Sequence, residues 1–542
     1  MRNERVTLRI HPFDNVAVAL QDLAKGARLD VDGASVVLKE TVASKHKFAI
    51  DNLDAGSDIR MYGILVGRAV RKIQQGEQIT TENIKHDSRE YGTGTGKWQW
   101  TKPSVAEFSG TTFQGYKRKD GKVGTANHWI VVPLVFCENR NVQFMKEALV
   151  NELGFGKSDH YKLQVRELAQ QYRKQQLNYY SHPALEPLFP NIDGIKFLGH
   201  TMGCGGTADD ARSLCGLLAG YVNHPNVAGA TILSLGCQDA QVSIFLEEIK
   251  KRNPTIDKPL LLFEQQAYGT ESALLSRAIE QTFNGLKEAN ECRRTPVPLD
   301  KLVVGVECGG SDGFSGLSAN PAIGYVSDVL AALNGTVILS EFPELCGVEQ
   351  DIIERCVSPA VARRFIEIQS DYAKKAELAG TGFYMNPSPG NIRDGLITDA
   401  MKSAGAVKKG GSSPVVDVLD YPEPVTKSGL NLLCTPGSDV ESTTALVGAG
   451  ANLVLFSTGL GTPTGNPIVP VIKVSSNSRI AERMHDIIDV DAGKIITGEE
   501  RIDDTGRRLL KTCVEVASGR VLAKAVQNGQ DDFIPWKRSL SL

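Results

Sequence analysis

The stretch that most constrains the fold is a short apolar run that leads directly into a glycine-rich turn, within residues 303–316. The run is typical of a buried strand, and residues 321–333 after the turn predict a helix. A strand, a turn and a helix in this order mark the place where an open α/β sheet binds its ligand. The turn therefore predicts a site for a small polar ligand or a metal ion; the alternative is a tight turn around a buried cysteine. Its chemically active residues are Glu307, Cys308, Ser311 and Asp312.

Several classes of function are excluded by motif and composition. The turn lacks the G-x-G-x-x-G pattern, and no G-x-x-x-x-G-K-[ST] occurs in the chain, so we expect no nucleotide cofactor. The net charge of -3 and the pI near 6.4 give no reason to expect nucleic acid as a partner. No apolar run approaches the roughly 20 residues of a membrane span, so we expect no membrane partner. The N-terminus has no apolar signal core and the ten cysteines form no C-x-x-C pair, which predicts a cytoplasmic protein with reduced thiols.

Changes of composition along the chain predict a multidomain α/β protein. Residues 1–86 contain short apolar strands between turn residues, which is typical of a small β-clip domain. Glycines and polar residues without an apolar period mark 87–112 as a linker. Strands and helices then alternate in a middle α/β domain at 113–294 and in a larger C-terminal domain at 295–542 with a mostly parallel, Rossmann-like sheet. The predicted strands are 7–10, 15–20, 34–38, 129–135, 194–198, 230–235, 302–306, 336–339, 415–418, 431–434, 452–456 and 469–474.

Cysteines follow several of these strands. In the middle domain three predicted strands each lead to a cysteine, and one more cysteine follows the strand that opens the C-terminal domain, within its glycine-rich turn. Parallel strands bring their carboxyl ends to one edge of a sheet, so we expect these thiols to approach one another and hold a metal. Thiolates with imidazole and carboxylate groups favour iron(II), with manganese(II) as its substitute, over magnesium. The predicted metal ligands are Cys137, Cys204, Cys237 and Cys308. The alternative ligand set is Asp312, Glu341 and Glu344, with the cysteines as packing.

Two stiff polar loops predict contacts to a substrate. In the first, at 386–391, two prolines restrict a loop that presents two amides and a hydroxyl, as recognition of a polyol requires. The second, at 456–466, is rich in threonine and glycine, which indicates an anion-binding turn that a substrate carboxylate would use. The predicted substrate-binding residues are Asn386, Ser388, Asn391, Thr458 and Thr462, with Ser311 from the first turn.

Motifs along nearly the whole chain resemble those of the altronate/galactarate dehydratase family. They are His-Thr-Met-Gly-Cys-Gly at 200–205, Leu-Gly-Cys at 235–237, the stretch 307–321, Asn-Pro-Ser-Pro-Gly-Asn at 386–391, and the stretch 456–463. The resemblance implies an N-terminal SAF domain in which His11 and His46 lie on one side and share a metal ion or a substrate group. It also implies a homodimer formed through the middle domain.

The same resemblance implies the activity, which is metal-dependent dehydration of D-altronate to 2-keto-3-deoxy-D-gluconate in hexuronate catabolism. Such a reaction needs a base for the proton next to the carboxylate and an acid for the departing hydroxyl. A divalent metal offsets the charge that builds up on the enediolate. The predicted catalytic residues are His200, Glu307, Asp312 and Glu341. The alternative role for Glu341 and Glu344 is to stabilise the start of the following helix.

Two positions depart from the family pattern. Leu460 stands where the family usually has arginine, and Gln238 stands where it often has glutamate. The first change removes a partner for a substrate carboxylate, and the second removes a metal ligand or base. The reaction class stands, but the sugar acid stays open between altronate, galactarate and another aldonate. A non-catalytic protein that binds a sugar acid is the second hypothesis.

Overall fold

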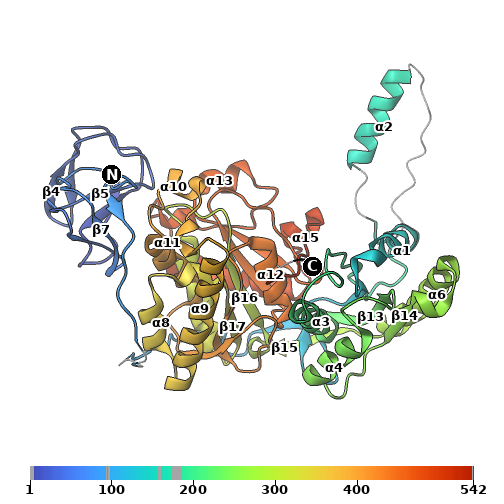
Figure 1. Cartoon of the computed structure of the whole chain (residues 1–542). Helices are drawn as coiled ribbons and strands as arrows, with labels where there is room; N and C mark the ends of the chain where they lie inside the picture. The colour runs from blue at the N-terminus through green and yellow to red at the C-terminus, as the bar shows by residue number, and fades with distance from the viewer. Residues whose placement is uncertain are drawn as a thin grey trace. The chain divides into compact units, whose positions relative to one another are not determined.

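Figure 1 shows a computed structural model of the chain, which describes residues 5–92, 94, 98–156, 160–173, 186–539 and 541. The chain forms two compact units. One unit joins Met1–Gly115 to Thr295–Trp536, and the other joins Tyr116–Arg294 to Lys537–Leu542. The N-terminal part and most of the C-terminal part of the sequence therefore belong to the same unit.

The first unit begins with a small domain of short strands. They are β1 (Thr7–Leu8), β2 (Val16–Ala19), β3 (Arg28–Val31), β4 (Ala34–Val37), β5 (Lys47–Ala49), β6 (Asp58–Met61), β7 (Ile64–Ala69) and β8 (Ile84–Lys85). They pair as antiparallel sheets in the orders β1-β2-β5, β3-β4 and β6-β7-β8. One of the two apolar cores also contains Phe314 and Leu317 from the glycine-rich turn, so the turn packs directly on this domain. The predicted small β-rich domain is confirmed.

The C-terminal part of this unit is built on a seven-stranded parallel sheet. Its strands are β16 (Val303–Cys308), β17 (Thr336–Leu339), β18 (Val415–Leu419), β19 (Gly429–Leu433), β20 (Leu453–Thr458), β21 (Val471–Ser475) and β22 (Val490–Asp491). Their order is β18-β19-β17-β16-β20-β21-β22, and every neighbouring pair is parallel. From β16 the chain first adds strands on the β17 side and then returns to add strands on the β20 side. This reversal between β16 and β20 defines a doubly wound sheet and confirms the predicted Rossmann-like fold class.

Helices connect these strands and bury them. All six residues of β20 are buried, because a parallel strand is covered on both faces. The helix predicted at 321–333 spans Ala319–Ala332 (α7) and packs against β17, β19 and β20. The others are α8 (Glu349–Arg355), α9 (Pro359–Leu378), α10 (Pro389–Arg393), α11 (Asp399–Ala406), α12 (Asp439–Gly448), α13 (Ser478–Arg483), α14 (Ile502–Ala517) and α15 (Lys524–Asn528). Short 3-10 helices are η3 (Leu299–Lys301), η4 (Phe342–Leu345), η5 (Phe383–Met385), η6 (Val407–Gly410) and η7 (Gly493–Ile495).

In the segment predicted as a linker, 87–112, most of the described residues lie outside helices and strands. The segment contains one helical turn, η1 (Ala106–Phe108), among its described residues. The indole N–H of Trp98 donates a hydrogen bond to the carbonyl of Ser412 at 3.1 Å. This contact attaches the segment to the C-terminal sheet domain.

The second unit is a smaller α/β domain around a four-stranded parallel sheet. Its strands β11 (His128–Pro133), β12 (Gly194–Phe197), β13 (Val227–Ser234) and β14 (Leu260–Glu264) lie in the order β12-β11-β13-β14. Trp129 fills its core, where a Cβ at Gly229 or Gly285 would lie 2.3 or 2.2 Å from the indole ring. A hairpin forms where β9 (Thr112–Lys117) pairs antiparallel with β10 (Val123–Gly124). β9 also pairs with β15 (Arg294–Pro298). The helices are η2 (Phe136–Glu138), α1 (Asn139–Glu152), α2 (His160–Arg173), α3 (Ala208–Asn223), α4 (Val242–Arg252), α5 (Gln265–Tyr268) and α6 (Glu271–Ala289).

Within the described residues, no helix is both long and apolar enough to span a membrane.

Candidate active site

The carboxyl ends of β16 and β20 lie side by side, because these neighbouring strands pair in parallel with Cys308 opposite Ser457. Each strand leads into a glycine-rich turn, and the strand order reverses between them. Open α/β sheets bind ligands outside such a reversal point. Two of the loops predicted as binding loops therefore meet where the fold favours a site.

Glycines allow the two turns to pack closely. The N–H of Gly459 donates to the carbonyl of Gly310 at 3.0 Å. A Cβ at Gly459 would lie 2.3 Å from the carboxyl carbon of Asp312, and a Cβ at Gly309 would lie 2.1 Å from the carboxylate of Asp439. Because carboxyl groups occupy this space, only glycine fits at these positions.

A buried group of carboxylates surrounds the thiol of Cys308. The thiol donates to Oε2 of Glu344 at 3.1 Å, and the backbone N–H of Cys308 donates to Oε2 of Glu341 at 3.1 Å. Each glutamate also holds a lysine, since Lys409 Nζ lies 2.5 Å from Glu341 and Lys402 Nζ lies 2.5 Å from Glu344. Ligand atoms of the cysteine and the two glutamates all lie within 4.8 Å of one another. The structure thus brings Cys308 together with two residues of the alternative ligand set.

Glu307 and Asp439 add two further carboxyl groups. Oε2 of Glu307 accepts hydrogen bonds from the hydroxyls of Ser340 and Ser442, both at 2.7 Å. Burial, reinforced by Glu341, raises the pKa of Glu307 well above its usual range. Burial also raises the pKa of Asp439 to about 7, with the nearby glutamates adding to the shift. Asp439 is therefore suited to exchange protons near neutral pH, and the raised pKa of Glu307 favours its protonated form.

The pKa values of Glu341 and Glu344 shift in opposite directions, because the lysines act more strongly on Glu344. Burial raises the pKa of Glu341, and the neighbouring Glu344 adds to that shift. Burial acts on Glu344 in the same direction, but Lys402 and Lys409 together outweigh it and lower the pKa of Glu344. Burial would lower the pKa of Lys409, yet Cys308 and the carboxylates raise it well above its usual range. The group therefore combines a firmly ionised carboxylate and ammonium with carboxyl groups that retain protons.

Two buried oxygens of this group have no hydrogen-bond partner among the described residues, namely Oε1 of Glu307 and Oε1 of Glu341. Glu341 also has a left-handed backbone φ of 66°, which is uncommon outside glycine and typical of functional positions. Lys409 pairs with Glu341 and Lys402 with Glu344, and both glutamates lie next to Cys308. Unpartnered buried oxygens in such a group fit a divalent cation, and a donor set of thiol and carboxylates suits iron(II) or manganese(II).

Asp312 lies at the other end of the first turn and is held by different partners. Its carboxylate accepts hydrogen bonds from Ser476 at 2.7 Å and Asn477 at 3.1 Å, and pairs with Lys45 at 2.9 Å. Lys45 also pairs with Asp394 at 2.8 Å. Since Lys45 belongs to the N-terminal β domain, these bonds attach that domain to the turn. The catalytic role of Asp312 stays a prediction.

The two N-terminal histidines make separate contacts. The ring of His46 lies 3.1 Å from the carbonyl of Arg393 through Nε2 and 3.0 Å from the amide of Gln78 through Nδ1. Nδ1 of His11 accepts a hydrogen bond from the N–H of Phe13 at 3.2 Å. None of the described contacts joins the two rings, so a site shared by them stays a prediction.

The loop at 386–391, predicted to recognise a polyol and called the polyol loop below, is bonded to the cluster of carboxylates and lysines around Cys308. Oδ1 of Asn386 accepts a hydrogen bond at 2.8 Å from Lys402, the lysine that pairs with Glu344. Ser388 and Asn391 form the capping box of α10, and the Asn391 amide also donates to the carbonyl of Ser311 at 2.8 Å. These bonds give the loop a fixed position beside the first turn. Substrate contacts of these residues stay predictions.

The second turn closes on itself. Oγ1 of Thr458 accepts hydrogen bonds from the N–H groups of Gly461 at 3.0 Å and Thr462 at 3.1 Å. Leu460, which lies between Thr458 and Gly461 in the sequence, is 39% exposed. An arginine at that position would therefore reach solvent or a ligand, whereas leucine offers no charge there.

In the second unit, His200 is buried with both ring nitrogens engaged. Nε2 lies 2.7 Å from the carbonyl of Pro133, and Nδ1 accepts from the N–H of Met202 at 3.1 Å. Burial lowers the pKa of His200 to about 4. The ring is therefore neutral near pH 7 and would have to release a backbone bond to transfer a proton. Its catalytic role stays a prediction.

Three of the four predicted cysteine ligands, Cys137, Cys204 and Cys237, are exposed free thiols of the second unit, whereas Cys308 belongs to the first. The clustered ligand groups found in the described parts of the chain do not include those three. Their convergence on one metal stays a prediction. Next to Cys237 in the sequence, the side-chain amide of Gln238 accepts a hydrogen bond from the N–H of Gly236 and donates one to the hydroxyl of Ser234, both at 2.7 Å. Glutamine therefore serves this turn both as an acceptor and as a donor.

Sequence reasoning missed the cations of the site. Lys45, Lys402 and Lys409 each pair with a buried carboxylate, and Asp439 lies against the first turn. Lys409 and Glu341 are separated by 68 positions. A Lys-Lys pair before glycines reads as a solvated turn, so only tertiary packing reveals its burial. Asp439 begins α12, where an acidic residue is expected in any helix.

Comparison with known families extends over the whole chain. The altronate/galactarate dehydratase SAF domain matches residues 5–87, and the D-galactarate dehydratase/altronate hydrolase second domain matches residues 115–290. The D-galactarate/altronate dehydratase C-terminal domain matches residues 299–541. Together with the site, these domains define the class of protein, which is a dehydratase of the hydro-lyase type.

Curated relatives match over nearly their full length. Altronate dehydratase of Escherichia coli is 33% identical over 97% of this chain and 97% of its own. Altronate dehydratase of Bacillus subtilis is 31% identical, again over 97% of both chains. Galactarate dehydratase (L-threo-forming) of E. coli is 30% identical over 95% of this chain and 93% of its own. The chain belongs to the altronate/galactarate dehydratase family, as its motifs predict.

Proposed function

We propose that this enzyme dehydrates D-altronate to 2-keto-3-deoxy-D-gluconate as a step of hexuronate catabolism. The observation that carries the proposal is the buried group of carboxylates and lysines beside Cys308, at the reversal point of the sheet. Altronate is favoured over galactarate because the two relatives above 30% identity are both named altronate dehydratase.

The residues of this group match the needs of the reaction. Cys308, Glu341 and Glu344 would hold iron(II), or manganese(II) in its place, and the bound ion would polarise the carboxylate and 2-hydroxyl of the substrate. Lys402 would balance the charge that develops on the substrate carboxylate, because its ammonium group already faces Glu344 and the polyol loop.

Two further carboxyl groups would move the protons. Asp439 takes the proton from C2 of the substrate, since its carboxylate lies against the first turn and is only partly buried. Glu307 is protonated and gives its proton to the 3-hydroxyl, which leaves as water while the C2–C3 double bond forms. The resulting enol then converts to the 2-keto acid.

We further propose that the enzyme works as a homodimer in the cytoplasm. All ten cysteines are free thiols, which supports a reducing compartment. The dimer rests on the family relationship, with the middle domain as the interface. Light scattering of the purified full chain should give twice the chain mass of 58.6 kDa; a monomer mass contradicts the dimer.

The substrate proposal is tested with the purified full chain, loaded anaerobically with iron(II). D-altronate and galactarate are supplied separately, and formation of a 2-keto acid is followed. We expect turnover of altronate that disappears when a chelator removes the metal. Turnover of galactarate alone contradicts the substrate, and full turnover in excess chelator contradicts the metal.

A further inference from the structure

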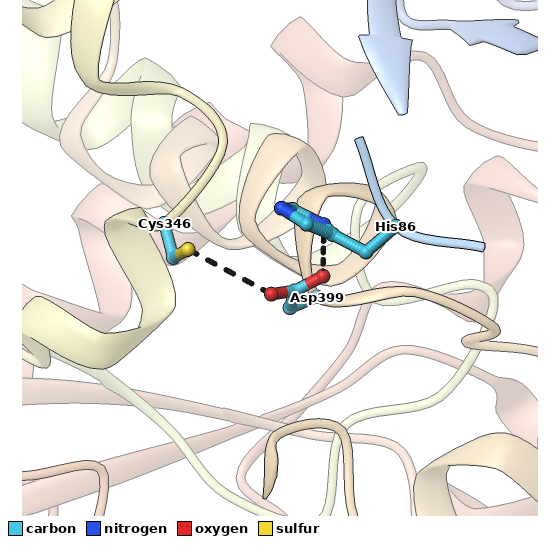
Figure 2. A group of neighbouring side chains, drawn as sticks. All are labelled: His86, Cys346 and Asp399. Carbon is cyan, nitrogen blue, oxygen red and sulfur yellow. Dashed lines mark hydrogen bonds and ion pairs between the residues drawn. The ribbon is translucent and has the colours of Figure 1, made fainter. Parts of the chain in front are cut away.

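A second cluster of metal-ligating side chains lies apart from the cluster formed by Cys308, Glu341 and Glu344. It consists of His86, Cys346 and Asp399 (Figure 2). We propose that these three side chains bind a divalent transition-metal ion of the zinc and iron(II) class. The ion ties the segment that leaves the N-terminal β domain to the C-terminal sheet domain, a role that the proposed dehydration does not require.

Three separate segments deliver the side chains. His86 directly follows β8, Cys346 directly follows η4, and Asp399 is the first residue of α11. Ligand atoms from each lie within 4.8 Å of those from the other two. Figure 2 shows Asp399 between its neighbours, with one oxygen toward the imidazole and the other toward the thiol. Only the folded unit brings these atoms together, so an ion bound here would stabilise that fold.

The spacing suits a single ion. In a tetrahedral site with bonds of about 2.3 Å to sulfur and about 2.1 Å to oxygen, these two atoms lie about 3.6 Å apart. Sγ of Cys346 and Oδ2 of Asp399 are separated by 3.7 Å. On the other side, Nδ1 of His86 is hydrogen-bonded to Oδ1 of Asp399, and this bond opens to admit the ion.

The charges of the group also favour a cation. Within the described chain, no lysine or arginine forms an ion pair with Asp399 or with the buried Glu349, which interacts electrostatically with both His86 and Cys346. The other donors to these carboxylates are backbone groups, such as Gly347 N–H at 2.8 Å from Glu349. The contrast is with Glu341 and Glu344, each of which is paired with a lysine. Here a metal ion has no ammonium group to displace.

Burial and ligand type narrow the choice of ion. The Asp399 side chain is 4% exposed, whereas that of His86 is 35% exposed, so the site is closed on one side and open to a water ligand on the other. Imidazole, thiolate and carboxylate are ligands of zinc and iron(II), while magnesium and calcium prefer oxygen alone. Cys346 also lies two residues after Glu344, so the ion would fix the segment that carries this glutamate.

Cobalt(II) provides the test, because a thiolate ligand gives it a charge-transfer absorption and its content can be measured independently. The parent protein is the full chain with Cys308→Ser, which removes the thiol of the first site. After chelator treatment and cobalt loading, we expect the thiolate absorption and bound cobalt in the parent. Adding Cys346→Ser should lower the thiolate absorption and remove one equivalent of cobalt per chain, whether or not the exposed Cys137, Cys204 and Cys237 also bind cobalt. Cys356→Ser, a buried cysteine outside both groups, is the matched control and should keep both.

His86→Gln is the second variant, since its side chain is partly exposed and its replacement disturbs packing least. Loss of a group that only hydrogen-bonds to a metal ligand weakens metal binding by about 10- to 100-fold. Because His86 would be a ligand itself, His86→Gln should weaken cobalt binding by more than that. The rival arrangement has no ion, with the Cys346 thiol and the His86 N–H simply donating to Asp399. Equal cobalt content and equal absorption in the parent, Cys346→Ser and His86→Gln would establish that arrangement and overturn the proposal.

Discussion

The ion pair of Lys409 and Glu341 offers the sharpest test of the buried charge balance. The two groups are 2.5 Å apart, and each side chain is 1% exposed. Lys409→Met keeps most of the side-chain volume but leaves the Glu341 carboxylate without its cation, beside Glu307 and Glu344. Breaking a buried pair in this way costs about 3–5 kcal/mol, because an uncompensated charge stays buried. We expect a loss of that size in the stability of the seven-stranded sheet.

A second substitution separates charge from packing. In Lys409→Met combined with Glu341→Gln both charges are gone, so at least half of the lost stability should return. Lys408→Met is the matched control, because this neighbouring lysine has no ion pair within the described chain. Native-state hydrogen exchange of peptides from β16 and β17 reports the opening free energy of the sheet itself. A cost below about 1 kcal/mol for Lys409→Met, or a double variant no more stable than the single one, refutes the reasoning.

Two further predictions concern other buried charges. The pKa of His200 is about 4 when folded and 6.5 when unfolded, so the unfolded state binds more protons between these values. The contribution of His200 to the stability of the second unit should therefore be constant above pH 6.5 and fall by up to about 3 kcal/mol as the pH drops to 4. Burial also lowers the pKa of His128 in β11 well below its usual range, so part of the pH slope stays when His200 is replaced. Hydrogen exchange of β11 should show a shallower slope in His200→Gln, and an unchanged slope contradicts the neutral buried ring. Lys45→Met should loosen the N-terminal β domain, because Asp312 and Asp394 lose their shared cation. Hydrogen exchange of β5 should then accelerate, whereas the exposed control Lys39→Met should leave it unchanged; equal rates in both variants contradict the attachment.

The sheet could be predicted from the sequence because its strands are apolar runs of the right length. The run at 336–339 is β17 as predicted, and the run at 452–456 falls within one residue of the start of β20. Parallel strands buried on both faces leave this signal regardless of their partners. The strand β14 was missed, because its run leads directly into a helix and apolar periodicity alone does not separate the two.

The site was predictable only in part. The turn with Cys308 is marked by its glycines, and Glu341 and Glu344 stand at the end of a predicted strand. The lysines that balance them carry no such mark, since a lysine is buried or exposed according to what packs above it. The contacts of His86 with Cys346 and Asp399 are likewise invisible in the sequence, because three distant segments supply them.

The central claim is that the group beside Cys308 carries out the dehydration, and Asp439 tests it most directly. Asp439→Asn keeps the size of the side chain and its place at the start of α12, but removes the base. Metal-loaded protein is assayed for kcat/KM with D-altronate, with Glu441→Gln on the same helix as the control. We predict a fall of about 10²- to 10⁴-fold for Asp439→Asn and none for the control. A kcat/KM for Asp439→Asn equal to that of the unsubstituted enzyme would contradict this assignment of the active site.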